Sequence, residues 1–261
     1  MAVIFVPGYV AHAASPPPPP PPPGYTCGGV VLDGATLLTN AALNSGADNG
    51  LYASVIWAYF TDISAFPTIW QADAAGFEPA LSINTTTNKY NLLFGTDALN
   101  QLDARSTSDP AVGSWVPIFV SSDTTGASNP KPCQIFIGDT DVTNVTSSTG
   151  GAFSTAFNGL DFVIGGDTFG DNLIGYLADT WIGVGQYLDW SVVGNRRKFM
   201  DAGGKPVDLG SDGSSPTGTA PAIFLSIPHG GTPANFATNL GTGGNFSVTG
   251  ALTLAPSSPS D

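Results

Sequence analysis

The residue types that enzymes use for acid, base and nucleophilic chemistry are scarce in this chain. Its 261 residues include a single glutamate, Glu78, in the loop-like segment AGFEP at 75–79. Glycoside hydrolysis needs two closely placed carboxylates, one protonated and one ionised, and no closely spaced Glu-x-Asp-x-x-Glu arrangement occurs. Nucleophilic catalysis needs a histidine base, and neither His12 nor His229 lies near a convincing nucleophile motif. We therefore expect a protein that is not an enzyme.

Calcium is the one cofactor that the acidic residues could hold. Two segments, DTD at 139–141 and DTFGD at 167–171, offer carboxylate oxygens, and the glycine of the second permits a tight turn. Asp side chains are also ordinary turn formers, because they hydrogen-bond to their own backbone. Both interpretations stay open for the four candidate ligands, which are Asp139, Asp141, Asp167 and Asp171. Without a cluster of Cys or His residues, a zinc site is not expected.

Five tryptophans could stack on sugar rings if their side chains were exposed. Trp57, Trp115 and Trp181 lie in segments that read as strands, where packing in the core is the simpler role. Trp70 lies between apparent loops. It is therefore the candidate glycan-binding ring.

The charge balance argues against a nucleic-acid partner. Seven Lys and Arg residues against twenty Asp and Glu residues give a formal charge of −13, and a nucleic-acid-binding face needs basic residues to replace phosphate counterions. No run approaches the roughly 18 apolar residues that cross a bilayer, so no membrane segment is expected. Cys27 and Cys133 are too few for a disulfide framework. Two free thiols are the simpler interpretation, and one bridge that ties the N-terminal arm to the domain is the alternative.

Short strand signals follow one another from Gly28 onward, each broken by turn residues. The expected strands are 30–32, 54–60, 90–94, 115–120, 134–137, 162–164, 176–182, 222–227 and 246–254. Segment 55–60 is almost continuously apolar, which indicates a strand covered on both faces, as in a sandwich. These features predict an all-β fold, a two-sheet antiparallel jelly-roll sandwich.

One short helix is expected after Asp189, which can cap it, and Gly203-Gly204 would end it. Its buried stripe would consist of Trp190, Val193 and Met200. The basic residues 196–198 would face solvent near its C-terminal end, where the helix dipole favours cations.

The N-terminal region has a different composition from the rest of the chain. Residues 16–23 are eight consecutive prolines, which predict a polyproline II spacer of roughly 25 Å. Before it, an apolar segment could anchor the protein to a partner through Val3, Ile4, Phe5, Val6, Tyr9 and Val10. A disordered tail with a low-complexity linker is the alternative. The expected layout is an anchor at 1–15, a linker at 16–27, the jelly-roll domain at 28–255 and a C-terminal tail at 256–261.

The order of these pieces resembles that of laminin-G-like, concanavalin A-like jelly-roll domains. The matching pieces are VVLDG at 30–34, IWAYF at 56–60, GSW at 113–115, QIFIGD at 134–139, IGG at 164–166 and GYLADTW at 175–181. Beyond residue 204 the chain looks like the C-terminal extension of such domains in structural proteins of tailed bacteriophages and prophages. Laminin-G-like domains often hold Ca²⁺ at a loop edge. The resemblance therefore implies the same role for the four candidate ligands, which are Asp139, Asp141, Asp167 and Asp171.

The resemblance implies a structural or decoration protein of a phage-like virion, on its capsid or tail. Such a protein would be made in the host cytoplasm and displayed on the virion surface. Its arm would dock to other virion proteins, and it would form a homo-oligomer within the assembly. The alternative is a lectin-like adhesion module that recognises host-surface glycans, with or without Ca²⁺.

Overall fold

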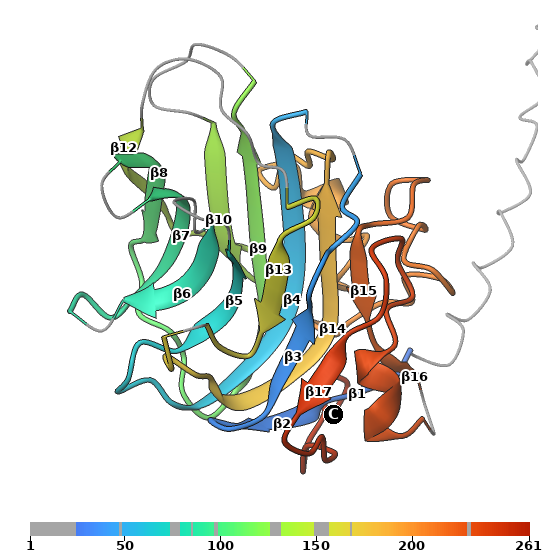
Figure 1. The fold of residues 1–261 in the computed structure, drawn as a ribbon. Helices are drawn as coiled ribbons and strands as arrows, with labels where there is room; N and C mark the ends of the chain where they lie inside the picture. The colour runs from blue at the N-terminus through green and yellow to red at the C-terminus, as the bar shows by residue number, and fades with distance from the viewer. Residues whose placement is uncertain are drawn as a thin grey trace, which may run out of the picture.

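Two antiparallel β-sheets stacked face to face form the body of the protein (Figure 1). The computed structural model describes residues 25–46, 49–73, 79–84, 86–96, 99–125, 132–148, 157–167, 169–228 and 231–261. The predicted jelly-roll sandwich is confirmed. Within these ranges no helix is long and apolar enough to cross a membrane.

The sheets have seven and eight strands. The seven-stranded sheet runs in the order β11 (Thr140–Asp141), β10 (Cys133–Ile137), β9 (Trp115–Asp123), β4 (Leu51–Asp62), β14 (Ile174–Val184) and β15 (Ile223–Leu225), and β2 (Val30–Asp33) also pairs with β14. The eight-stranded sheet runs in the order β12 (Thr143–Ser148), β8 (Leu99–Ser106), β7 (Lys89–Thr96), β6 (Ala80–Asn84), β5 (Thr68–Asp73), β13 (Asp161–Ile164), β3 (Leu37–Asn40) and β17 (Ser247–Thr249). Outside the sheets lie the strand pair β1 (Cys27–Gly28) and β16 (Ile227–Pro228), the helix α1 (Val193–Arg196) and the 3-10 helix η1 (Pro233–Ala237).

Aromatic rings fill much of the space between the sheets. Tyr52 of β4, Phe94 of β7 and Phe162 of β13 are fully buried there, together with Phe157. The ring of Trp70 stacks on that of Phe162 with 5.4 Å between centroids. Rings in such contact add about 1 kcal/mol each beyond the area they bury, so this cluster joins strands of both sheets.

The seven-stranded sheet is buried on both faces. Alternate residues of β4 point to opposite sides, so Ile56 and Phe60 enter the core between the sheets while Val55 and Trp57 enter a second cluster. The chain after β14 closes over this second cluster with Leu188, Trp190, Phe199, Met200, Leu209 and Phe224. The apolar run at 55–60 is therefore covered on both sides, as predicted. Its outer cover is an irregular segment.

The expected helix in that segment is much shorter than predicted. Only Val193–Arg196 is helical. Trp190 and Met200 are buried as predicted, but Val193 is 51% exposed, so the prediction is wrong for that residue. Asp189 forms a local turn instead, in which its Oδ1 accepts the Ser191 N–H at 2.9 Å. Gln134 of β10 donates to the same oxygen at 2.8 Å. Contacts with the sheet, rather than helical periodicity, determine the path of this segment.

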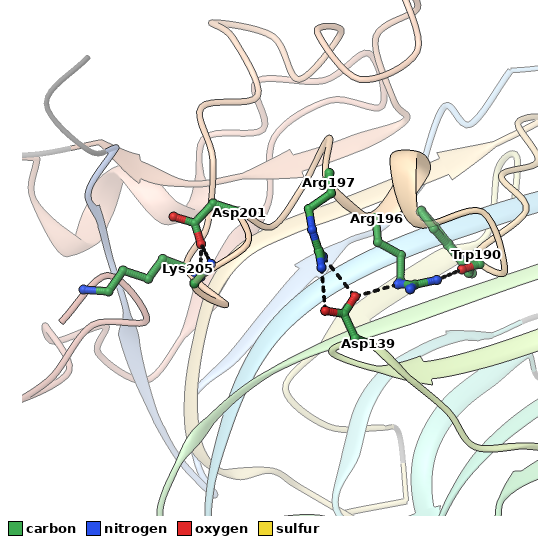
Figure 2. Close-up of polar contacts among 7 residues, drawn as sticks. Asp139, Trp190, Arg196, Arg197, Asp201 and Lys205 are labelled. Carbon is green, nitrogen blue, oxygen red and sulfur yellow. Dashed lines mark hydrogen bonds and ion pairs between the residues drawn. The ribbon is translucent and has the colours of Figure 1, made fainter. Parts of the chain in front are cut away.

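The sequence predicted that residues 196–198 face solvent, and Lys198 does. Arg196 and Arg197 instead hold the segment to the sheet (Figure 2). Asp139, in the turn between β10 and β11, pairs with Arg196 Nε at 3.0 Å and with Arg197 Nη2 at 2.6 Å. Arg196 is buried, lies over the ring of Phe136 and also donates to the Trp190 carbonyl. A buried guanidinium needs such partners, because an unpaired buried charge is costly. The three residues Asp139, Arg196 and Arg197 are called the Asp139 clamp below.

Residues expected to form the end of the linker and the tail pack on the sandwich. The Cys27 N–H donates to Ser260 Oγ at 3.1 Å, and Ser258 Oγ donates to the Cys27 carbonyl at 2.6 Å. Trp115 Nε1 donates to Ser257 Oγ at 3.0 Å. The folded unit therefore includes Tyr25–Cys27 and the C-terminal residues, which lie beside β1 (Figure 1). Cys27 and Cys133 are both free and buried, in agreement with the simpler interpretation of the sequence.

A buried carboxyl group lies where the chain enters the domain. Asp179 forms a bulge in β14, with a φ of 23°, and its Oδ1 accepts hydrogen bonds from Ser226 Oγ at 2.6 Å and Tyr25 Oη at 3.2 Å. Its Oδ2 is buried and has no partner in the described part of the chain. Burial raises the pKa of Asp179 to about 6 from the ordinary value of 3.8.

Asp179→Asn should stabilise the protein at neutral pH. The variant keeps the oxygen that accepts from Tyr25 and Ser226 but cannot ionise. Because the folded-state pKa lies above the unfolded value, wild-type stability should fall as pH rises from 3.8 through about 6. The total loss is about 3 kcal/mol for a shift of this size. Urea unfolding at pH 4 and pH 7.5 should show this loss in wild type and in the exposed control Asp161→Asn, but not in Asp179→Asn.

The Asp139 clamp gives the opposite dependence on pH. Arg197, followed by Arg196, lowers the pKa of Asp139 to about 2, so the stabilisation is present above pH 3.8 and is lost as pH falls toward 2. Asp139→Asn should reduce the free energy of unfolding by about 2 kcal/mol at pH 7, mainly because Arg196 loses its charged partner. Asp141→Asn is the matched control on the same turn. Equal urea midpoints for the two variants would show that the clamp is not needed.

Candidate functional site

A groove of about 350 Å³ lies on the outer face of the eight-stranded sheet, between β5–β7 and the loop that joins β13 to β14. Its lining residues fall into four kinds: exposed aromatic rings, amides, carboxylates, and small or aliphatic residues of the floor. They are Phe66 and Phe169; Gln71, Asn84 and Asn91; Asp167 and Asp171; and Thr68, Ala80, Ser82 and Leu93.

The floor is polar because strand residues alternate between the two faces of the sheet. In β6, Leu81 and Ile83 point into the core, which leaves Ser82 on the outer face. Across the sheet, Ser82 lies opposite Asn91 of β7 on one side and Thr68 of β5 on the other. Short side chains in this row leave room for a ligand above the strands.

The wall is a loop ordered by one carboxylate. Asp167 Oδ1 accepts the backbone N–H groups of Phe169, Gly170 and Asp171 at 2.8, 2.8 and 2.9 Å. The Thr68 N–H donates to the Asp171 carbonyl at 3.1 Å, which attaches the loop to the start of β5. Figure 1 shows this loop beside that strand. Gly170 has a φ of 98°, a conformation that favours glycine.

Two aromatic rings project into solvent at this wall. Phe169 is 69% exposed, and Phe66, in the loop before β5, is 39% exposed. Large exposed aromatic side chains cost free energy in water, so their presence beside a groove points to a binding role. The loop that carries Phe66 leads directly into β5, and the loop that carries Phe169 is hydrogen-bonded to the start of β5. Both rings are therefore held near the floor of the groove.

One polar atom of the floor lacks a partner. Asn91 Oδ1 is shielded from solvent and forms no hydrogen bond within the described residues. A buried acceptor without a donor costs about 1–3 kcal/mol, and a ligand that donates a hydrogen bond here would remove this cost. Across the strand pair, Arg105 lies opposite Asn91 and is committed to Asp103, with Nη2 at 2.8 Å from Oδ2.

The groove carries uncompensated negative charge. Burial, together with the neighbouring Asp167, raises the pKa of Asp171. No Lys or Arg is present among the described residues that line the groove, and neither carboxylate forms an ion pair with another described residue. The site is therefore suited to neutral or cationic ligands.

The four predicted calcium ligands fall at two separate places. Asp139 is engaged by two arginines in the Asp139 clamp, and Asp141 accepts from Thr143 N and Oγ1 at 2.9 and 2.6 Å. This pair does not fit a Ca²⁺ site, because Arg196 and Arg197 already supply the positive charge beside Asp139. Asp167 and Asp171 do lie together in the groove.

Calcium binding at the Asp167 pair stays a prediction. Ca²⁺ takes six to eight oxygen ligands, and one oxygen of Asp167 is already used by the loop backbone. Within the described ranges, no group of three or more His, Cys, Asp or Glu residues could hold a metal. Most ligands would have to come from backbone carbonyls, water or the glycan.

The prediction of an exposed Trp70 is wrong. Trp70 is in β5 and points into the core, where it is fully buried against Phe162, so it cannot stack on a sugar. The predicted docking residues Val3, Ile4, Phe5, Val6, Tyr9 and Val10 lie outside the described residues.

The two aromatic rings of the groove were not among the binding residues predicted from the sequence. Phe169 carried a usable signal, because an aromatic residue between Asp, Thr and Gly turn residues has no apolar neighbours to pack with. Phe66 gave a weaker signal of exposure, because Ile63 and Pro67 lie close to it in the sequence.

No family model matches the chain, and no curated protein matches it in sequence. Solved structures match it in fold. A candidate carbohydrate-binding protein from Bacteroides ovatus superposes with a TM-score of 0.57 at 12% identity, over 89% of this chain and 61% of that one. This likeness shows the fold alone.

Two further structures are less similar. A heptameric SAP-like pentraxin from Limulus polyphemus has a TM-score of 0.47 at 11% identity, over 63% of this chain and 79% of that one. The LG4-5 domains of the mouse laminin α1 chain have a TM-score of 0.44 at 12% identity, over 69% of this chain and 48% of that one. The likeness to the Bacteroides ovatus protein agrees with the jelly-roll sandwich described above.

Proposed function

We propose that this protein is a carbohydrate-binding domain that holds a glycan in the groove without cleaving it. The observation that carries the proposal is the pair of exposed rings, Phe66 and Phe169, beside a polar floor with an unpartnered amide oxygen at Asn91. The Bacteroides ovatus protein, itself described as a candidate carbohydrate-binding protein, supports the proposal at the level of fold.

Each part of the groove suits one part of a sugar. The C–H faces of a pyranose ring pack against aromatic rings, and hydroxyl groups exchange hydrogen bonds with amides and short polar side chains. Asn84 Oδ1 is occupied by Thr87, which leaves the Asn84 amide N–H groups to donate to a sugar oxygen. Asn91 Oδ1 accepts from a sugar hydroxyl. A rigid wall reduces the conformational entropy lost on binding.

Binding without hydrolysis is the simpler role for the two carboxylates. A glycosidase needs one carboxyl group that donates a proton and one that attacks or activates water. Asp167 is engaged in loop structure through its Oδ1 and three backbone N–H groups. That engagement favours a positioning role for Asp167 in the wall over proton transfer.

Phe169→Ala should lower glycan affinity about tenfold or more, because an anchoring aromatic side chain contributes at least 1.4 kcal/mol. Phe66→Ala should have a smaller effect, in line with its smaller exposed fraction. Affinities should be measured by calorimetry on glycans selected from a broad array. Val193→Ala is the matched control, since it removes an exposed apolar side chain from α1, outside the groove.

The same experiment tests calcium. If Asp167 and Asp171 hold Ca²⁺ for the glycan, a chelator should lower affinity and added Ca²⁺ should restore it. Wild-type protein that binds no glycan on the array, with or without Ca²⁺, would contradict the proposed function.

A second candidate role is that of a decoration protein on a phage-like virion, displayed on the particle surface and attached through the N-terminal arm. The layout of the chain favours it: an apolar segment, eight prolines and then a folded domain. The hydrogen bonds of Tyr25 and Cys27 attach the base of the arm to the sandwich, so a docked arm would carry the domain with it. Repeated copies on a particle would make a homo-oligomer, and the two roles are compatible.

Deleting residues 1–24 should release the protein from purified particles while leaving the domain folded, because Tyr25 and its partners are retained. Replacing Val3, Ile4, Phe5 and Val6 with Ser is the matched variant that keeps the length of the arm. Quantitative immunoblots of particles purified with each variant give the measurement. Undiminished amounts of both variants on particles would contradict arm docking.

A further inference from the structure

We propose that the groove selects glycans with free amino groups, such as glucosamine oligomers, over their N-acetylated counterparts and over acidic glycans. This inference rests on the proposed function and specifies the ligand class of the same site. It follows from the balance of donors and acceptors in the groove and from the distribution of charge around it.

Beside the Asn84 amide donors, the groove has several acceptors with unused capacity. Asn91 Oδ1 is shielded from solvent and has no partner among the described residues. Within the same residues, Asp167 Oδ2 has a long contact, 3.4 Å, with Thr68 Oγ1. Asp171 lines the groove with its carboxylate, which forms no ion pair in the described part of the chain. An ammonium group has three donors and no acceptor, so it complements this set better than a hydroxyl or an acetamide does.

The negative charge at the wall is not neutralised by the protein itself. Two other carboxylates on the outer face of the same sheet or close to it are engaged: Asp103 with Arg105, and Asp109 with Lys89 at 2.6 Å. Asp167 and Asp171 repel one another, which contributes to the raised pKa of Asp171. A ligand cation placed between them would relieve this repulsion, whereas a sialic acid, uronate or sulfate would add to it.

The aromatic rings fit the same ligand class. Phe169 lies between the two carboxylates in sequence, and the loop that carries it is ordered by Asp167. A cation over an exposed aromatic face gains about 0.5–1 kcal/mol, and the C–H face of the same sugar can pack on the ring. The formal charge of −13 would also draw a polycationic glycan toward the protein and slow the approach of an anionic one.

The test is a titration of the full chain with three oligosaccharides of equal length: glucosamine, N-acetylglucosamine and a uronic acid. At pH 6.5 and low salt, we expect the glucosamine oligomer to bind about tenfold tighter than the N-acetylated one, which corresponds to one added charge contact. The uronic acid oligomer should bind more weakly than either. Asp171→Asn should lower affinity for the glucosamine oligomer about tenfold and so remove its preference over the N-acetylated one.

The control is Asp212→Asn, which changes the net charge by the same amount on an exposed turn outside the groove. If it reduces glucosamine binding as much as Asp171→Asn does, the attraction is non-specific and the inference is wrong. If the N-acetylated oligomer binds as tightly as glucosamine and the binding requires Phe169, the proposed function stands and the inference is overturned. If none of the oligomers or the broader array binds, the proposed function itself fails.

Discussion

The burial of the seven-stranded sheet on both faces is the constraint on which the rest of this structure depends. Its central strands, β4 and β14, carry apolar side chains toward the sandwich core on one side and toward a second cluster on the other. An irregular segment closes the outer side, and the Asp139 clamp attaches that segment to the sheet. Since the central strands are covered on this side, their outer face offers little room for a ligand.

The eight-stranded sheet is buried on its inner face, and part of its outer face lines the groove. Its inner residues are as apolar as those of its partner, while its outer residues are short and polar, so this face stays accessible. The loop between β13 and β14 crosses to β5 and turns part of that face into a groove. Its order comes from Asp167 and from the Thr68 backbone, and binding energy is therefore not spent on ordering the wall.

Two buried ionisable groups show how differently the fold treats charge. Arg196 has a carboxylate partner and a carbonyl acceptor, so its charge is stabilised. Among the described residues, Asp179 has two hydroxyl donors, no cation and one unpartnered oxygen, and burial raises its pKa to about 6. The first group holds the outer cover and the second lies beneath the base of the N-terminal arm. The two ends of the pH range should therefore affect different parts of the molecule.

The all-β class and the strongly apolar strands follow from the sequence. Segments 54–60 and 176–182 read clearly as strands because residues buried on both faces make continuous apolar runs. Strands β6 and β8 were missed, since polar residues are mixed with apolar ones along them and their composition resembles that of loops. Trp70 was predicted to lie in a loop for the same reason, because residues of mixed polarity border its strand.

Only the tertiary structure decided the site and the outer cover. Long-range pairing places Asp139 beside Arg196 and Arg197, 57 and 58 residues away, and no local pattern encodes that contact. The groove likewise joins Phe66, Asn91 and Phe169 from separate loops and strands. Local propensity and periodicity act over a few residues, whereas a binding surface depends on which strands become neighbours. Of the groove residues the sequence indicated only Asp167 and Asp171, and the register of the eight-stranded sheet determined which residues meet there.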